Sequence, residues 1–160
     1  MFQRMSVCLM ALSLLGGAAD RGGFDGKWIL DGGSTGDEAV PVDLVQKIQQ
    51  KGSDVEVQST FAEPASGVIP LLYVGVMAND LMLSTDGSVK QNQIGPFQQA
   101  SKTTLDGTTM TTEWTAVFKG EDINGKWIRT LQPDGGHMTL EIHESSKGED
   151  HTAMLNFHRK

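Results

Sequence analysis

The feature that most constrains this chain is a series of short runs with the alternation of β-strands, divided by glycine-containing turns. In the run 55–61, Val55, Val57, Ser59 and Phe61 share one face, while polar residues occupy the other. A period of two residues is the pattern of a strand with one buried face. No long segment after residue 19 has a helical period. The pattern therefore predicts an all-β protein.

The strands expected from this pattern are 27–30, 42–50, 55–61, 68–77, 81–85, 88–93, 97–105, 108–118, 126–132, 137–144 and 152–159. The segment 42–50 fits a strand or one face of a helix, and a turn-like sequence at 51–54 favours the strand. Asp-Gly and Asn-Gly pairs, including Asn124-Gly125, are expected to form tight hairpin turns. Because short links make neighbouring strands antiparallel, we expect an up-and-down meander of about ten strands. Closing such a meander into a barrel removes its exposed edges.

Residues 1–19 have the layout of a secretory signal peptide. Arg4 precedes an apolar run at residues 5–15, and small residues follow as far as Ala19. The run is shorter than the about 20 apolar residues of a transmembrane helix. A buried N-terminal helix is the alternative, but the run lacks the polar face of an amphipathic helix. We therefore expect cleavage after Ala19, export to the periplasm or the medium, and one barrel domain over residues 20–160 with no membrane span.

Composition excludes several chemistries. The single cysteine, Cys8, lies inside the predicted leader, so the mature chain would have no disulfide, thiolate nucleophile or cysteine-based metal site. The formal net charge is −7 at pH 7. An acidic protein repels phosphate backbones and anionic lipid, which argues against nucleic acid or a membrane surface as a partner.

The stretch Phe24-Asp25-Gly26-Lys27-Trp28 resembles the Gly-x-Trp opening of lipocalins and fatty-acid-binding proteins. Residues 48–61 resemble a hairpin of the fatty-acid-binding branch, and the whole pattern also resembles a group of uncharacterised exported bacterial proteins. The resemblance implies a lipocalin-like barrel of the calycin superfamily, often enclosing a small hydrophobic or amphiphilic ligand. It also implies that Gly26, Trp28 and Arg159 close the barrel base, with Arg159 packed over the Trp28 indole.

The chain departs from the fatty-acid-binding pattern in two places. Those proteins grip a carboxylate with an Arg-x-Tyr pair on the final strand, whereas this chain has Asn156-Phe157-His158-Arg159. The loop 31–39 is also too short for the family's two-helix lid. Both departures weaken the expectation of fatty-acid capture.

Inward-facing polar and aromatic residues are the candidates for a ligand site: Ser59, Tyr73, Trp114, Trp127 and Arg129. Arg129 either pairs with an anionic ligand inside the barrel or lies near the rim and reaches solvent. Tyr73 and Ser59 either donate hydrogen bonds to a ligand or pack as ordinary core residues.

Catalytic, metal and cofactor sites are not expected. His137, Glu141 and His143 share a face that lies opposite an apolar one, so the row should be outer and solvated. No Gly-x-Ser-x-Gly nucleophile motif occurs in the chain. We therefore expect a non-catalytic exported protein that binds a small hydrophobic or amphiphilic molecule. The alternative is an envelope structural or interaction module with a filled barrel; the pattern leaves the oligomeric state open.

Overall fold

The computed structural model describes residues 23–32, 42–62 and 75–160. The predicted signal peptide lies outside these residues. The described chain forms ten strands, which are β1 (Gly26–Gly32), β2 (Val42–Lys51), β3 (Asp54–Ala62), β4 (Leu81–Ser84), β5 (Asp86–Ile94), β6 (Phe97–Asp106), β7 (Thr109–Phe118), β8 (Glu121–Leu131), β9 (His137–Ser146) and β10 (Glu149–Arg159). The described residues include no helix long and apolar enough to cross a membrane.

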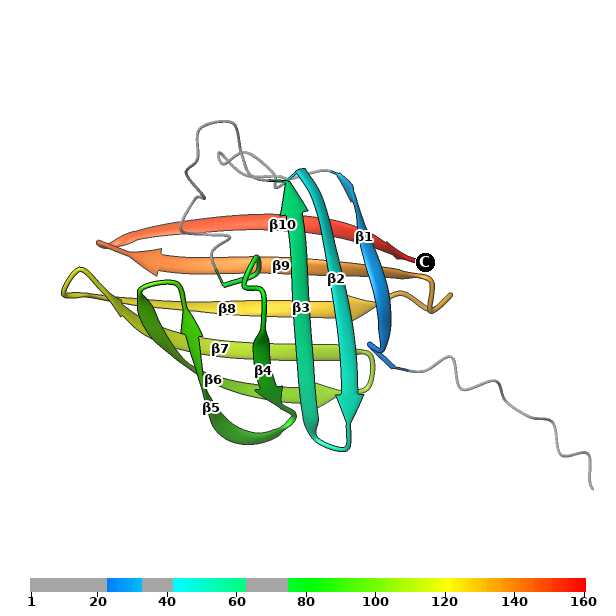
Figure 1. Ribbon diagram of the computed structural model, residues 1–160, viewed down its shortest axis with the longest axis horizontal. Helices are drawn as coiled ribbons and strands as arrows, with labels where there is room; N and C mark the ends of the chain where they lie inside the picture. Colours follow the sequence, from blue (N-terminus) through cyan, green and yellow to red (C-terminus); the bar gives the residue numbers. More distant parts are fainter. Residues whose placement is uncertain (1–22, 33–41, 63–74) are drawn as a thin grey trace, which may run out of the picture.

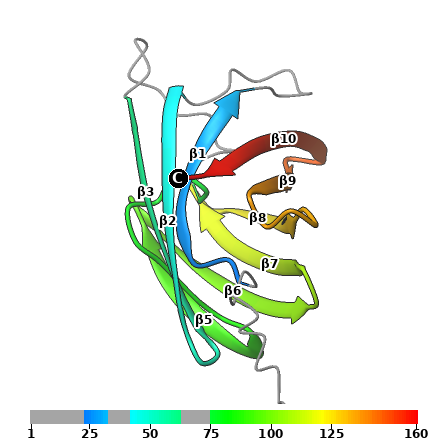
Figure 2. The same cartoon turned by 90° about the vertical axis from the view of Figure 1, so that its right-hand side faces the viewer.

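All ten strands form one antiparallel sheet in the order β4-β3-β2-β1-β10-β9-β8-β7-β6-β5. The sheet wraps round on itself, so that β1 to β4 face β5 to β10 across the interior (Figure 1; Figure 2). The first and last strands pair with each other, with Trp28 opposite Arg159. The prediction of an all-β, up-and-down barrel of about ten strands is confirmed, as is the strand expected at 42–50.

The barrel is nearly closed, and its one unpaired seam lies between β4 and β5. These strands follow each other in the sequence with only Thr85 between them, yet they form opposite edges of the sheet. The buried Asn92 side chain spans the seam: its Oδ1 accepts from the Met82 N–H at 2.7 Å, and its Nδ2 donates to the Met82 carbonyl at 2.9 Å. One side-chain amide thus replaces a backbone ladder pair.

The turn expected at Asn124-Gly125 is wrong, because β8 runs without a break through both residues. The hairpin between β7 and β8 instead turns at Lys119-Gly120, where both residues have a positive φ. Gly125 is needed for close packing: a Cβ at that position would lie 2.5 Å from Trp114 Cζ2 and 2.5 Å from the His143 carbonyl oxygen. Here glycine leaves space for an indole ring and does not form a turn.

The strand expected at 68–77 is also wrong over its described part, since residues 75–77 form a turn. This turn is buried, with Val76 at 1% exposure. The Val76 carbonyl accepts hydrogen bonds from Gln46 Nε2 at 3.0 Å and Ser59 Oγ at 2.8 Å. Internal partners therefore satisfy the backbone here, where a strand would have used ladder bonds. Residues 68–74 lie outside the described residues.

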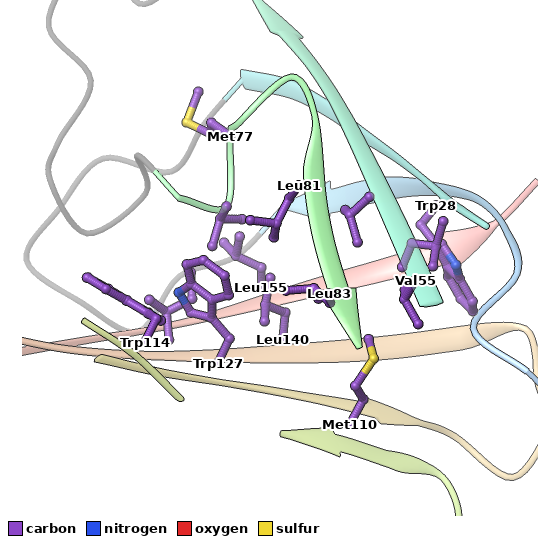
Figure 3. Packing of buried hydrophobic residues seen from close by; sticks show 14 of the residues in the cluster. Trp28, Val55, Met77, Leu81, Leu83, Met110, Trp114, Trp127, Leu140 and Leu155 are labelled. Atoms are coloured by element: carbon purple, nitrogen blue, oxygen red, sulfur yellow. The ribbon is translucent and has the colours of Figure 1, made fainter. Parts of the chain in front are cut away.

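The core lies inside the barrel and is built from alternate residues of every strand. It includes Val55, Leu81, Leu83, Met110, Trp127, Leu140 and Leu155, all at or below 1% exposure (Figure 3). Burying one large aliphatic or aromatic side chain contributes about 1.5–3 kcal/mol. With strands of period two, this burial sets which side chains face the interior and therefore which ones can meet a ligand.

Candidate functional site: the barrel interior

Arg129 is the most unusual residue of the interior. It lies on β8, opposite Met110 of β7 and Leu140 of β9, and its exposure is 0%. Its guanidinium carbon lies 5.9 Å from the centroid of the Trp127 ring. Among the described residues, no group hydrogen-bonds to its Nε, Nη1 or Nη2. The alternative in which Arg129 reaches solvent at the rim is therefore wrong.

The environment of Arg129 penalises its charge. Burial lowers the pKa of Arg129 from its ordinary value to about 10, because a charged guanidinium loses its hydration in the interior. The contact with the Trp127 ring offsets part of this loss. A buried cation with five N–H donors is most stable when an anion accepts from it. A carboxylate, sulfonate or phosphate group has the chemistry to pair with this guanidinium.

Trp114 and Trp127 lie together on the same wall, from β7 and β8. Their ring centroids are 5.6 Å apart with an angle of 38° between the rings. Figure 3 shows the two side chains next to each other. Trp114 is 6% exposed and Trp127 is 0% exposed. Neither indole N–H donates a hydrogen bond within the described residues. The pair offers broad apolar faces and two free donors.

Ser59 and Tyr73 have different outcomes. Ser59 is buried, but its hydroxyl donates to the Val76 carbonyl and also lies 3.2 Å from Gln46 Nε2. Its hydrogen bonds are thus made within the chain itself. Tyr73 lies outside the described residues. Of the five predicted ligand-binding residues, the structure brings Trp114, Trp127 and Arg129 to one wall of the barrel.

Several interior polar residues escaped the sequence reasoning. Gln46, Gln99 and Glu144 are buried, and in each of them Oε1 lacks a partner among the described residues. Thr103 and Thr112 are buried as a hydrogen-bonded pair at 2.9 Å. The alternation itself carried the signal, since Glu144 continues the inward series of Leu140 and Ile142. The interior is therefore more polar than a simple hydrophobic core.

The three residues of the predicted barrel closure lie together at the base. The guanidinium carbon of Arg159 is 4.6 Å from the Trp28 ring centroid, and its Nη2 donates to the Gly23 carbonyl at 2.6 Å. Trp28 Nε1 donates to the Phe24 carbonyl at 2.8 Å. Gly26 has a φ of 140°, and a Cβ there would lie 3.5 Å from the Arg159 side chain. The indole and the guanidinium cover this end of the core.

Outside the barrel, an open groove of about 700 Å³ crosses β5 to β10. Its walls are mostly outward side chains such as Lys102, Thr115 and Asn124. Trp114 is the only predicted ligand-binding residue on its border, which also includes the buried Glu144. The row of His137, Glu141 and His143 also lies outside, with His143 Nε2 3.7 Å from Glu141 Oε2. Among the described residues, no group of three or more His, Cys, Asp or Glu side chains is arranged to hold a metal ion.

Ten antiparallel strands wrapped around one interior, with a tryptophan and an arginine packed at the base, define a calycin-like barrel. No family model matches the sequence, and no curated protein matches it significantly. Among solved structures, the chain is similar to a secretory abundant heat soluble (SAHS) protein from Ramazzottius varieornatus. The TM-score is 0.56 and the identity 14%, over 86% of this chain and 95% of that chain.

The chain is also similar to zebrafish ileal bile acid-binding protein, solved in complex with cholic acid. The TM-score is 0.52 and the identity is again 14%, over 86% of this chain and 98% of that chain. At this identity, the two likenesses show the fold.

Proposed function

We propose that this protein is an exported, non-catalytic binding protein that holds a small amphiphilic anion inside its barrel. The observation that carries the proposal is Arg129, which is 0% exposed and has no hydrogen-bond partner among the described residues. A buried charge without a partner is destabilising. The cost is on the order of several kcal/mol, which is the desolvation penalty of one ion. An anionic ligand would offset this cost and would meet an apolar surface at Trp127 and Trp114.

The fold supports the same proposal. The zebrafish neighbour is a bile acid-binding protein solved in complex with cholic acid, an amphiphile with a carboxylate. A barrel of ten strands is wider than the eight-stranded barrels that hold one small ligand. Export is supported by the signal-peptide pattern of residues 1–19. The neighbour from Ramazzottius varieornatus is named as a secretory protein, which agrees with export.

Titration with cholate and with dodecanoate, followed by tryptophan fluorescence and calorimetry, tests the proposal. We expect saturable binding of at least one of these anions, because Trp127 lies 5.9 Å from the Arg129 guanidinium and would sense it. Arg129→Met should weaken that binding about tenfold or more, since a charged hydrogen bond is lost. Lys126→Met is the matched control, because Lys126 lies on the same strand and pairs with Glu113 on the outer face.

If neither anion binds the wild-type chain, or if Arg129→Met binds them equally well, the proposal fails. The alternative of a filled barrel that acts as an envelope structural or interaction module would then be favoured. Export has its own test. When the full chain is expressed in a secreting bacterium, the mature protein should begin at Asp20, as measured by intact mass. An unprocessed cytoplasmic product would contradict export without affecting the binding proposal.

A further inference from the structure

A second polar group without a partner lies on the same interior wall as Arg129. Glu144, on β9, is 3% exposed, and its Oε1 has no hydrogen-bond partner among the described residues. A buried carboxyl oxygen without a donor is destabilising. Glu144 therefore calls for a hydrogen-bond donor or a cation at the position of its carboxyl group.

The strand register gives the spacing between the two groups. On β8 and β9, Arg129 pairs with Leu140, and Gly125 pairs with Glu144. The positions are four residues apart along each strand, which is about 13 Å at about 3.3 Å per residue. Glu144 Oε1 and the three guanidinium nitrogen atoms of Arg129 lack hydrogen-bond partners among the described residues, so no hydrogen bond joins Arg129 to this oxygen.

The surface between the two groups is apolar and aromatic. Trp127 and Ile142 pair directly with each other midway between Arg129 and Glu144. Trp114 pairs with Gly125, and its ring occupies the space that a side chain at Gly125 would need. Figure 3 shows Trp114 beside Trp127 on this wall. The wall therefore runs from a cation, over two indole rings, to a carboxyl group.

We propose that the ligand is an elongated molecule with two polar ends, an anionic head at Arg129 and a cationic or hydroxyl group at Glu144, whose backbone positions lie about 13 Å apart along the strands. This inference rests on the proposed binding function and narrows its ligand class. A plain fatty acid would satisfy Arg129 alone. A diacid would place a second anion against Glu144, where the two charges repel each other.

Four probes of one chain length test the inference: ω-aminododecanoate, ω-hydroxydodecanoate, dodecanoate and dodecanedioate. Their affinities for the full chain are measured by calorimetry and tryptophan fluorescence at neutral pH. We expect the ω-amino and ω-hydroxy acids to bind about tenfold tighter than dodecanoate, because each donates to the Glu144 carboxyl group. Dodecanedioate should be the weakest of the four.

Glu144→Gln keeps an acceptor oxygen but removes the charge. It should reduce the preference for ω-aminododecanoate over dodecanoate to about threefold or less and should improve the binding of dodecanedioate. Glu141→Gln is the matched control, because Glu141 lies on the same strand with its side chain outside the barrel, 3.7 Å from His143. Thermal unfolding of each variant establishes that it is folded before binding is compared.

The outcomes separate this inference from the proposed function. If dodecanoate binds in an Arg129-dependent manner and the ω-substituted acids bind no tighter, the inference is overturned and the proposed function stands. If the preference for ω-aminododecanoate survives Glu144→Gln unchanged, the assignment of Glu144 is wrong. If none of the four probes binds, the inference is overturned, and the proposed function then depends on whether cholate binds. The comparison of probes on the wild-type chain needs no variant, so a misfolded variant does not weaken the test.

Discussion

Replacing Arg129 with methionine should make the protein more stable, although it removes the proposed anchor for the ligand. Arg129 is 0% exposed, and none of its nitrogen atoms has a partner among the described residues. Methionine is unbranched and adapts to irregular spaces, so it fills much of the same volume without a charge. The substitution therefore exchanges a desolvated cation for an apolar side chain.

The expected gain follows from the shift in pKa. Burial lowers the pKa of Arg129 from its ordinary value to about 10, and each unit corresponds to about 1.36 kcal/mol against the charged form. The charge thus costs about 3 kcal/mol on folding. The contact with the Trp127 ring, about 0.5–2 kcal/mol, is lost in the variant. We therefore expect the free energy of unfolding to rise by about 1–3 kcal/mol.

Urea unfolding followed by tryptophan fluorescence at neutral pH measures this gain, with Lys126→Met on the outer face as the control. The control should change stability by no more than about 0.5 kcal/mol. The stability gap should be constant at every pH below the folded-state pKa of about 10, because Arg129 is charged there in both states. Above that pH the gap should narrow, since the folded protein loses the proton before the unfolded chain does. A less stable Arg129→Met variant would refute this account of an unpaired charge.

Three further predictions concern the frame of the barrel. Gly125→Ala should lower the free energy of unfolding by about 1–3 kcal/mol, because its Cβ meets an indole ring. Gly136→Ala has ordinary contacts at 3.7 Å and should not lower it. Thermal unfolding compares the two variants. Asn92→Ala should lower the free energy of unfolding by about 1–3 kcal/mol. It should also speed hydrogen exchange along β4, and exchange as slow as in the wild-type chain would contradict the role of Asn92. The pKa of Asp86 is lowered to about 2, first by the hydrogen bond from the Ser88 N–H. Asp86→Asn should therefore destabilise the protein above the ordinary pKa of 3.8, and the difference should vanish as the pH falls through about 2 in acid unfolding.

Local pattern was enough to predict most of the strands and the side chains that face inward. Val55, Val57 and Ser59 are expected on one face of their strand, and all three are buried. This succeeds because a strand has a period of two and the core accepts only one of its faces, so that alternation and burial carry the same information. The number of strands and their antiparallel order followed from the short links between them.

The role of each glycine was harder to predict, because glycine both permits turns and leaves room for close packing. Asn124-Gly125 has the sequence of a hairpin turn, yet only the tertiary structure shows that the Trp114 ring lies against Gly125. The true turn, Lys119-Gly120, has a non-glycine residue at positive φ. A local pattern does not contain the position of a side chain on the neighbouring strand, so it does not separate a bend from a close approach.

The sequence by itself determined the all-β class and most of the inward faces of the strands. Only the tertiary structure decided that the seam lies between β4 and β5, that Arg129 is buried rather than at the rim, and that Glu144 belongs to the same wall. The physical reason is that alternation specifies the face of a strand but not the depth along it. Depth, and with it the cost of an unpaired charge, depends on how the whole sheet closes.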